Sequence, residues 1–202
     1  MKDDPKNIIL DFGGVLMRHN REGFLQAMQA LVCNVADLSE AVGLGNDRPD
    51  TLRARFEIGE IGEEEFVKHV LALCKPGTTA QQVIEAWNMI HAGIDDSTWA
   101  EVRRLKENGH NMYLLSNTDA IHWAHTMALY GEQIDELFDE LFLSFRVGLA
   151  KPDETIYRLV NDAIHATPDS TLFVDDTAVN RRVAEECVGW KTYAEINELD
   201  LG

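Results

Sequence analysis

The chain has 202 residues, of which 45% are hydrophobic and 26% are charged, and this predicts one folded domain, or one domain carrying an insertion, with a substantial core. Its formal charge of −17 excludes nucleic acid and anionic membranes as expected partners, and requires that a site for an anionic substrate be locally positive. The three cysteines are far apart, so we expect reduced thiols. The acidic start of the chain has no signal-peptide pattern and no apolar run could span a bilayer, so we expect a cytoplasmic protein.

Five short segments have the composition of β-strands, at residues 8–12, 111–117, 140–145, 171–176 and 191–196. The first, second and fourth are continuous apolar runs, which are typical of parallel strands covered on both faces. Helical periodicity separates them, at residues 95–109, 151–164 and 180–189. In the first of these helices, Ser97 is the expected N-cap and Gly109 the expected C-terminal stop. The alternation of strand and helix predicts an α/β fold with a mostly parallel sheet.

Residues 18–93 interrupt this alternation, because they contain no strand-like run. Helical periodicity occurs there in four segments, at residues 21–32, 49–59, 62–74 and 79–90. We therefore predict a four-helix insertion at 18–93, and a core formed by residues 1–17 and 94–202. The insertion is either additional scaffold or a lid over a site.

Three of the apolar strands end in polar residues that carry chemistry. Asp11 ends the first strand, Ser116-Asn117-Thr118 the second, and Asp175-Asp176 the fourth. Ligands of open parallel sheets bind at the carboxyl ends of the strands, so these groups are expected to converge there. Lys151 precedes Pro152, which at the first turn of a helix would fix the loop that presents the lysine. Each element alone also fits a helix cap or a common dipeptide, but two adjacent carboxylates require a cation or a shared proton.

Taken in order, these elements resemble the four motifs of the haloacid dehalogenase-like hydrolase superfamily. The motifs correspond to "LDFGGVL", "LLSNT", "KP" and "VDDTAVN", and the resemblance covers nearly the whole chain. Within the insertion, "RFEIGEIGEEEF" and "EAWN" resemble the branch that contains bacterial glucose-1-phosphate phosphatase and the phosphatase domain of soluble epoxide hydrolase. The resemblance implies a Rossmann-like core and a helical cap of the four-helix-bundle type.

The resemblance also implies a metal site. Asp11 would attack phosphorus and form an aspartyl-phosphate, which divides one difficult displacement into two easier ones. A Mg²⁺ ion would be held by Asp11, by the backbone carbonyl of Gly13 and by Asp176, with Asp175 as a further or indirect ligand. Asn180 and Thr118 would orient this shell.

The remaining motif residues would bind the phosphoryl group. Ser116 and the backbone around Asn117, Gly13 and Gly14 would hold its oxygens, and Lys151 would neutralise both Asp11 and the transferring group. Asp11, Ser116 and Lys151 are thus the expected catalytic residues. The expected partner is a small phosphorylated molecule, with a sugar phosphate as first choice; the sequence carries no signal of oligomeric state.

Gly13 departs from the family pattern, because most phosphatases of the superfamily have an aspartate there as general acid and base. Such a group contributes about 10²–10⁴-fold to a rate. A cap residue, a nearby histidine such as His19, or water would have to replace it. Alternatively, the leaving group is acidic enough to depart unaided, as in an anomeric sugar phosphate, or the protein is a catalytically weak binder of phosphorylated ligands. A metal-independent 2-haloacid dehalogenase also needs no second acid, but the Asp175-Asp176 pair favours the phosphatase.

Several residues outside the motifs have two interpretations. His122 and His125, three residues apart, are expected to be solvated or capping rather than metal ligands. Trp87 is expected in the core of the insertion, with a position facing the cleft as the alternative. Glu57 and Glu60 are expected to be surface groups, unless the cap uses them to recognise sugar hydroxyls.

Overall fold

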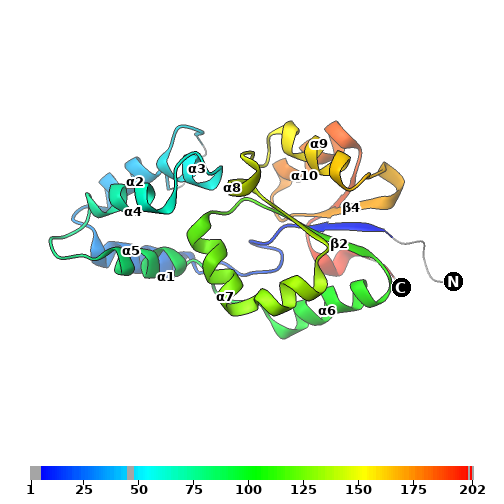
Figure 1. Ribbon diagram of the computed structural model, residues 1–202, viewed down its shortest axis with the longest axis horizontal. Helices are drawn as coiled ribbons and strands as arrows, with labels where there is room; N and C mark the ends of the chain where they lie inside the picture. The colour runs from blue at the N-terminus through cyan, green and yellow to red at the C-terminus, as the bar shows by residue number, and fades with distance from the viewer. Residues whose placement is uncertain (1–5, 45–47, 200, 202) are drawn as a thin grey trace.

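The computed structural model describes residues 6–44, 48–199 and 201 (Figure 1). The acidic start of the chain, from which we expect no signal peptide, lies for the most part outside these residues. Five parallel strands form one sheet in the order β3-β2-β1-β4-β5. The strands are β1 (Asn7–Leu10), β2 (Asn111–Ser116), β3 (Glu140–Leu143), β4 (Thr171–Val174) and β5 (Lys191–Tyr193). The predicted parallel sheet and Rossmann-like α/β core are confirmed.

The strand register brings the motif residues to one edge of the sheet. Leu10 of β1 pairs with Leu114 of β2 on one side and with Val174 of β4 on the other. The next residue, Asp11, donates its backbone N–H to the carbonyl of Val174 at 2.8 Å. Asp11, Ser116 and Asp175 are therefore neighbours because the strands that they follow are in register.

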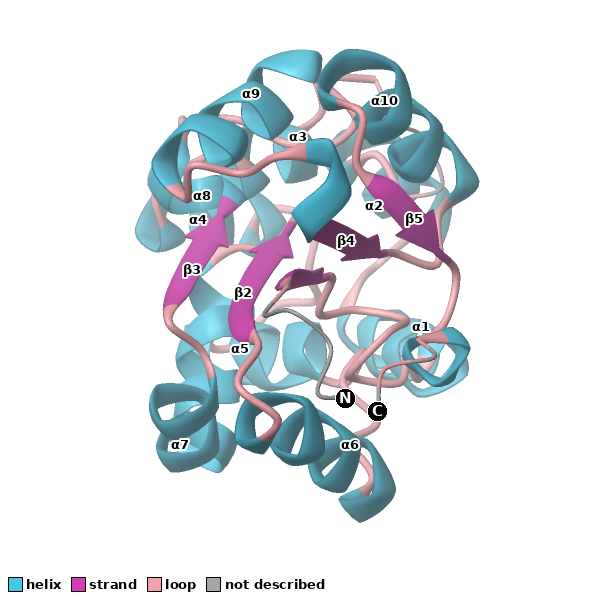
Figure 2. Cartoon of the chain, turned by 90° about the vertical axis from the view of Figure 1, so that its right-hand side faces the viewer, coloured by secondary structure: helices cyan, strands magenta, loops and turns pink. Residues whose placement is uncertain are grey.

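Helices cover both faces of the sheet (Figure 2). α6 (Asp96–Glu107) and α7 (Ala120–Leu137) pack on one face, and α9 (Glu154–Ala163) and α10 (Ala178–Val188) on the other. Side chains of a strand alternate between its faces, so Ile8 and Leu10 lie in the cluster beneath α6 and α7, whereas Ile9 packs beneath α9 and α10. Both faces of the central strands β1 and β4 are buried, which is why each of them contains three consecutive apolar residues. The short elements are α8 (Ser144–Val147), η1 (Pro168–Ser170) and η2 (Ile196–Glu198).

Two predicted helix starts are wrong by a few residues. α6 begins at Asp96 with Asp95 as its N-cap, since the carbonyl of Asp95 already accepts from the N–H of Trp99. Ser97 therefore lies inside the first turn. In α9 the N-cap is Asp153, so Pro152 precedes the helix instead of occupying its first turn. The expected stop at Gly109 is confirmed, because this residue follows α6 with a φ of +91°.

α7 was not among the predicted helices, and its packing explains why. Ile121 near its start packs in the hydrophobic cluster of the insertion, whereas Trp123, Ile134 and Leu137 pack against the sheet. Because the two clusters lie in different directions, the apolar residues of α7 do not form the single stripe by which an amphipathic helix is recognised.

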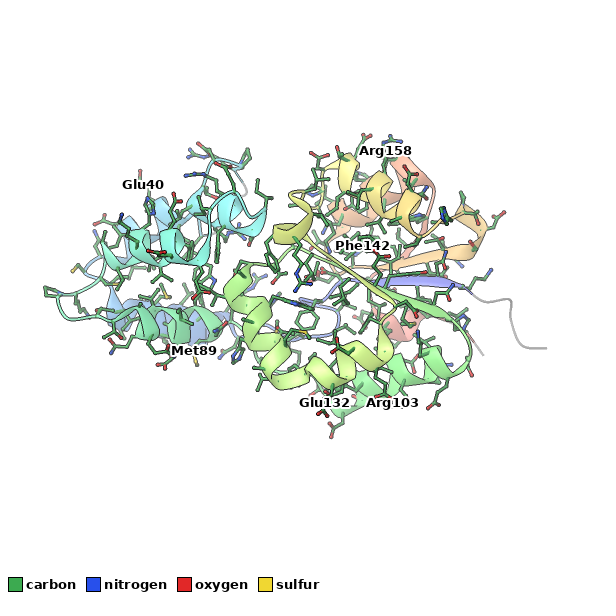
Figure 3. The ribbon with its side chains drawn as sticks, in the orientation of Figure 1. Glu40, Met89, Arg103, Glu132, Phe142 and Arg158 are labelled. Atoms are coloured by element: carbon green, nitrogen blue, oxygen red, sulfur yellow. The ribbon has the colours of Figure 1, made fainter. Side chains whose placement is uncertain are left out.

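In the residues that the structure describes, the insertion contains the four predicted helical segments and one more. Its helices are α1 (Arg21–Leu31), α2 (Val35–Val42), α3 (Leu52–Glu57), α4 (Glu63–Leu71) and α5 (Ala80–Asn88). α2 was not predicted; it begins after Asn34, whose side chain caps it. The five helices lie together at one end of the molecule, and Figure 3 shows Glu40 and Met89 on them, far from Phe142 in the sheet. They enclose a hydrophobic cluster that includes Phe56, Phe66 and Trp87 and that Ile121 of α7 also joins. The division into a core and a cap at residues 18–93 stays a prediction.

Two chain segments join the cap to the core, and they are hydrogen-bonded to each other. Ala92 donates its N–H to the carbonyl of Arg18 at 2.9 Å, and Asn20 donates to Ile90 at 2.7 Å. We call these segments, residues 18–20 and 90–93, the hinge. Within the part of the chain that the structure describes, no helix is both long and apolar enough to cross a bilayer.

Candidate active site

Asp11 lies at the carboxyl end of β1 with only 8% of its surface exposed. Its Oδ1 accepts a hydrogen bond from the N–H of Phe12 at 2.7 Å and is 2.9 Å from Nζ of Lys151. Burial raises the pKa of Asp11 to about 7, although the charge of Lys151 acts in the opposite direction. The carboxylate is thus held in one orientation, facing a cation.

Lys151 connects two strand ends. Its Nζ lies 2.9 Å from Asp11 Oδ1 and 2.6 Å from Asp175 Oδ2, and all three residues are buried. Burial alone would lower the pKa of Lys151, but the two carboxylates outweigh it and hold the pKa above its usual value. The ammonium group is therefore a fixed positive charge at the centre of the site.

Three carboxylates gather at this end of the sheet. Oxygen atoms of Asp11, Asp175 and Asp176 all lie within 4.8 Å of one another. One ammonium group does not balance three carboxylates, and the remaining negative charge and the all-oxygen donor set suit a hard divalent cation such as Mg²⁺.

The two acids after β4 have different surroundings. Asp175 is fully buried, and accepts hydrogen bonds from the N–H of Thr177 at 2.8 Å and from Nδ2 of Asn180 at 3.1 Å. Asp176 is exposed towards the cavity and lies against Gly14, where a Cβ would overlap its carboxylate. The carboxylate of Asp175 is thus hydrogen-bonded within the protein, whereas that of Asp176 is open to a ligand. This difference fits the prediction that Asp176 binds Mg²⁺ directly and Asp175 indirectly.

The segment after β2 is tied to the neighbouring loops. Asn117 holds the Lys151 loop, because its side-chain amide donates to the carbonyl of Lys151 at 2.7 Å and accepts from the lysine N–H at 2.8 Å. Ser144, which is fully buried at the end of β3, bonds both the N–H and the carbonyl of Thr118 at 2.9 Å. The Asn117 side chain and Thr118 thus position the loop, while buried Ser116 lines the cavity beside Asp11.

Gly14 allows the chain to turn after the first strand. It has a φ of +84°, which favours glycine, and its N–H donates to the carbonyl of Met17 at 2.8 Å. This amide is therefore engaged in the turn, in contrast to the predicted contact with phosphate.

A cavity of about 610 Å³ lies between this end of the sheet and the cap. The predicted site residues that line its floor are Asp11, Gly13, Ser116, Asn117, Thr118, Lys151, Asp176 and Asn180. The cap and hinge residues that line its other walls include Arg21, Phe24, Leu25, Leu44, Arg53, Glu57, Trp87, Ile90, His19 and His91. The cavity thus combines a charged floor with a wall that carries both polar and apolar groups.

Glu57 differs from the surface position expected for it. Its side chain is 21% exposed, pairs with Arg53 Nη1 at 3.2 Å and lines the cavity. Burial raises its pKa, while Arg53 acts to lower it. Glu60 is on the surface as predicted, paired with Arg55 at 2.7 Å. Of the two glutamates, only Glu57 fits the alternative of contact with a substrate.

His122 is also less exposed than predicted. Its Nδ1 lies 2.8 Å from Asp119 Oδ2 and its Nε2 lies 3.0 Å from the carbonyl of Trp87, with 16% of the side chain exposed. Burial alone would lower the pKa of His122, but Asp119 reverses this and raises it. His91, 4.8 Å away between ring centroids, has its pKa lowered to about 3 by burial and by His122. The shifts in pKa therefore favour the charged form of His122 and the neutral form of His91 on this wall of the cavity.

His19 lies beside Gly13. Its Nε2 would be 2.7 Å from a Cβ placed on Gly13, so its imidazole ring fills the space next to that glycine. Burial lowers the pKa of His19, and Arg21 adds to this. His19 and Gly13 both line the cavity, so His19 stays a possible substitute for the acid that is absent at Gly13.

Sequence reasoning did not identify Arg53, Asp119 or Ser144. Asp119 follows "SNT" and is the N-cap of α7, so recognition of that helix would have drawn attention to it. Ser144 follows the third strand, and the rule that parallel-sheet ligands bind at strand ends applied to it as well. Arg53 had no local signal, because it lies in an ordinary amphipathic helix.

Comparison with known proteins places this site in a family. The family model described as haloacid dehalogenase-like hydrolase matches residues 5–187. The chain is 30% identical over 199 residues to D-ribitol-5-phosphate phosphatase of Bacteroides thetaiotaomicron, a match that spans 96% of this chain and 94% of that protein. It is 34% identical over 189 residues to bifunctional epoxide hydrolase 2 of Sus scrofa, spanning 85% of this chain and 33% of that protein.

A solved structure agrees. A haloacid dehalogenase family enzyme from Bacteroides thetaiotaomicron, crystallised with magnesium and inorganic phosphate, superimposes with a TM-score of 0.83 at 27% identity, over 94% of this chain and 93% of that chain. The resemblance predicted from the four motifs is thus confirmed, and the chain belongs to the haloacid dehalogenase-like hydrolases.

Proposed function

We propose that this protein is a Mg²⁺-dependent phosphatase that hydrolyses a small phosphorylated metabolite through an aspartyl-phosphate intermediate. The observation that carries the proposal is the placement of Lys151 between Asp11 and Asp175, with Asp176 open to the cavity. This arrangement holds a nucleophilic carboxylate, a fixed cation and a set of cation ligands within a few ångströms of one another. The relative named as a phosphatase and the structural neighbour that holds magnesium and phosphate support it.

In this proposal the residues of the chain have distinct roles. Asp11 attacks phosphorus, and Lys151 orients it and stabilises the negative charge of the transferring group. Ser116 donates a hydrogen bond to a phosphoryl oxygen. Mg²⁺ bound by Asp11, Asp176 and the Gly13 carbonyl would neutralise repulsion between the nucleophile and the phosphate dianion.

The cavity wall favours a hydroxyl-bearing substrate, so a sugar phosphate remains our first choice, and the structure and the comparisons add a polyol phosphate to it. Hydroxyl groups both donate and accept hydrogen bonds, and the Arg53–Glu57 pair on α3 offers both functions to the cavity. The cavity volume of about 610 Å³ suits a metabolite of this size. The similarity to D-ribitol-5-phosphate phosphatase supports the same choice. Such a substrate is consistent with a cytoplasmic enzyme that has neither a nucleic acid nor a membrane as partner.

One assay tests the proposal. Hydrolysis of p-nitrophenyl phosphate is measured with Mg²⁺ and with EDTA, for the wild type and for Asp11→Asn. We expect turnover that needs Mg²⁺ and is abolished in Asp11→Asn. Halide release from a 2-haloacid without metal would instead identify a dehalogenase. Stabilisation by phosphate without any turnover would identify a ligand-binding protein. A panel of phosphorylated sugars, polyols, nucleotides and acyl phosphates then identifies the substrate.

A further inference from the structure

His19 is placed by the hinge, which fixes the backbone on both sides of it. The carbonyl of Arg18 accepts from Ala92, and the N–H of Asn20 donates to Ile90, so His19 and His91 face each other across a short antiparallel bridge. The position of His19 is thus determined by two hydrogen-bonded segments where the cap joins the core, close to the catalytic residues.

The ring of His19 occupies the space beside Gly13. A Cβ on Gly13 would lie 2.7 Å from its Nε2 and 3.0 Å from its Cε1, which is closer than side chains pack. The carboxylate oxygens of an aspartate at position 13 would lie at a similar reach from that Cβ. Residue 13 therefore lacks a side chain where His19 brings a polar ring nitrogen, and both residues line the cavity with Asp11.

We infer that His19 is a catalytic residue that donates a hydrogen bond from Nε2–H to the leaving oxygen of the phosphate ester, in place of a side chain at Gly13. This inference rests on the proposed phosphatase function. A neutral imidazole is sufficient as the donor, because polarisation of an oxygen requires only the N–H group.

The reaction then proceeds by two displacements at phosphorus. Asp11 forms a bond to phosphorus as the bond between phosphorus and the ester oxygen breaks, and the electron pair of that bond stays on the departing oxygen. The Nε2–H group of His19 stabilises this developing charge. Water supplies the proton that completes the alcohol, and the corresponding hydroxide cleaves the aspartyl-phosphate, so one water is consumed per ester.

The dependence of the rate on the leaving group tests this role. We would measure kcat/KM with Mg²⁺ for a series of aryl phosphates of decreasing phenol acidity, ending with an alkyl phosphate. In His19→Ala we expect a loss of about 10²-fold for the alkyl phosphate, which leaves as a poor anion, and only a few-fold loss for p-nitrophenyl phosphate. His19→Gln keeps an N–H donor, so we expect it to restore part of the alkyl phosphate rate. Gly13→Asp combined with His19→Ala, where the new carboxyl has room, is expected to do the same.

His69→Ala is the matched control, because His69 is exposed on α4 outside the cavity. An equal loss for every leaving group in His19→Ala, or no loss, would overturn the inference. If His19→Ala does not fold, His19→Gln decides: a larger loss for the alkyl phosphate than for p-nitrophenyl phosphate supports the inference, whereas an equal loss for every leaving group, or no loss, overturns it. Absence of Mg²⁺-dependent turnover in the wild type would refute the proposed function instead, so the two failures are distinguishable.

Discussion

Trp87 in cap helix α5 donates its indole N–H to Oδ2 of Asp119 at 3.0 Å, and Asp119 is the N-cap of core helix α7, three residues after Ser116. Both residues are buried. A single hydrogen bond therefore links the interior of the cap to the loop that we propose holds the phosphoryl group.

Loss of this bond is expected to weaken both stability and substrate binding. Trp87→Phe keeps an aromatic ring but leaves a buried carboxylate without one donor, at a cost of about 1–3 kcal/mol in the free energy of unfolding. KM should rise, because the loop after β2 loses a support. Trp190→Phe is the control: Trp190 donates to Asn161 at 3.2 Å and does not line the cavity. Denaturant unfolding and steady-state kinetics measure the two effects, and equal KM values in the two variants would contradict the link.

His122 predicts a pH dependence of stability. Its two ring nitrogens both face acceptors, Asp119 and the carbonyl of Trp87, and only the imidazolium form can donate to both. Its folded pKa is above the ordinary histidine value of 6.5, so its contribution to stability is complete below pH 6.5 and is lost as the pH rises through the raised folded pKa. The pKa of Asp119 is lowered, because His122 outweighs its burial, so the carboxylate remains charged throughout this window. The ionisable groups around the His122 ring are Asp119, Glu57, His19, His91 and His125.

The measurement is the unfolding free energy of the wild type and of His122→Gln across this range of pH. We expect the wild type to be more stable by about 3 kcal/mol on the acid side, because the variant leaves Asp119 buried without its partner. The difference should shrink as the pH rises. His91 has the opposite sign, since its folded pKa of about 3 destabilises the fold below pH 6.5; burial, the larger cause, acts in both proteins, whereas the part due to His122 is absent from the variant. A constant difference between the two proteins would show that His122 is not charged in the folded state.

Removal of Lys151 is expected to be costly, and Mg²⁺ should compensate for part of the loss. Lys151→Met leaves the buried carboxylates of Asp11 and Asp175 facing each other, which costs about 3–5 kcal/mol. A divalent cation bound to the same acids would restore part of this, so the melting temperature of the variant should rise steeply with Mg²⁺. Lys106→Met is the control, because its pair with Asp139 is partly exposed and is worth at most about 1 kcal/mol. Equal stability of the two variants without metal would contradict the assigned charge balance.

Substitution of Gly59 is expected to weaken substrate binding, because Gly59 lies where the cap contacts the core. It has a φ of +71°, and a Cβ there would overlap the backbone carbonyl of Phe145 in core helix α8. Gly59→Ala is therefore expected to displace α3, with Arg53 and Glu57, away from the core, and to raise KM. Gly77→Ala is the control, because Gly77 has a φ of +89° but an added Cβ would meet nothing within 4 Å. Both variants should lose about 1–2 kcal/mol of stability through backbone strain. A KM that is unchanged in Gly59→Ala would show that the contact between Gly59 and Phe145 does not position the substrate.

The sequence alone was sufficient for the sheet and for the floor of the site. The apolar strands pair in register, so polar residues that follow them must meet at one edge; Asp11, Ser116 and Asp175 could be placed together without a structure. Lys151 was assigned to this group through the order of the four motifs. These features depend on local patterns and on one geometric rule for parallel sheets.

The cavity wall was decided by the tertiary structure. Trp87 and Asp119 are 32 residues apart, and their contact exists only because the cap folds over the start of α7. Glu57 looked like a surface residue because the pattern of α3 does not show which element covers its polar face. His19 and Gly13 are six residues apart in a turn, and no periodicity predicts that an imidazole ring fills the space beside a glycine. Such contacts depend on how separately formed elements pack, and this information is spread over the whole chain.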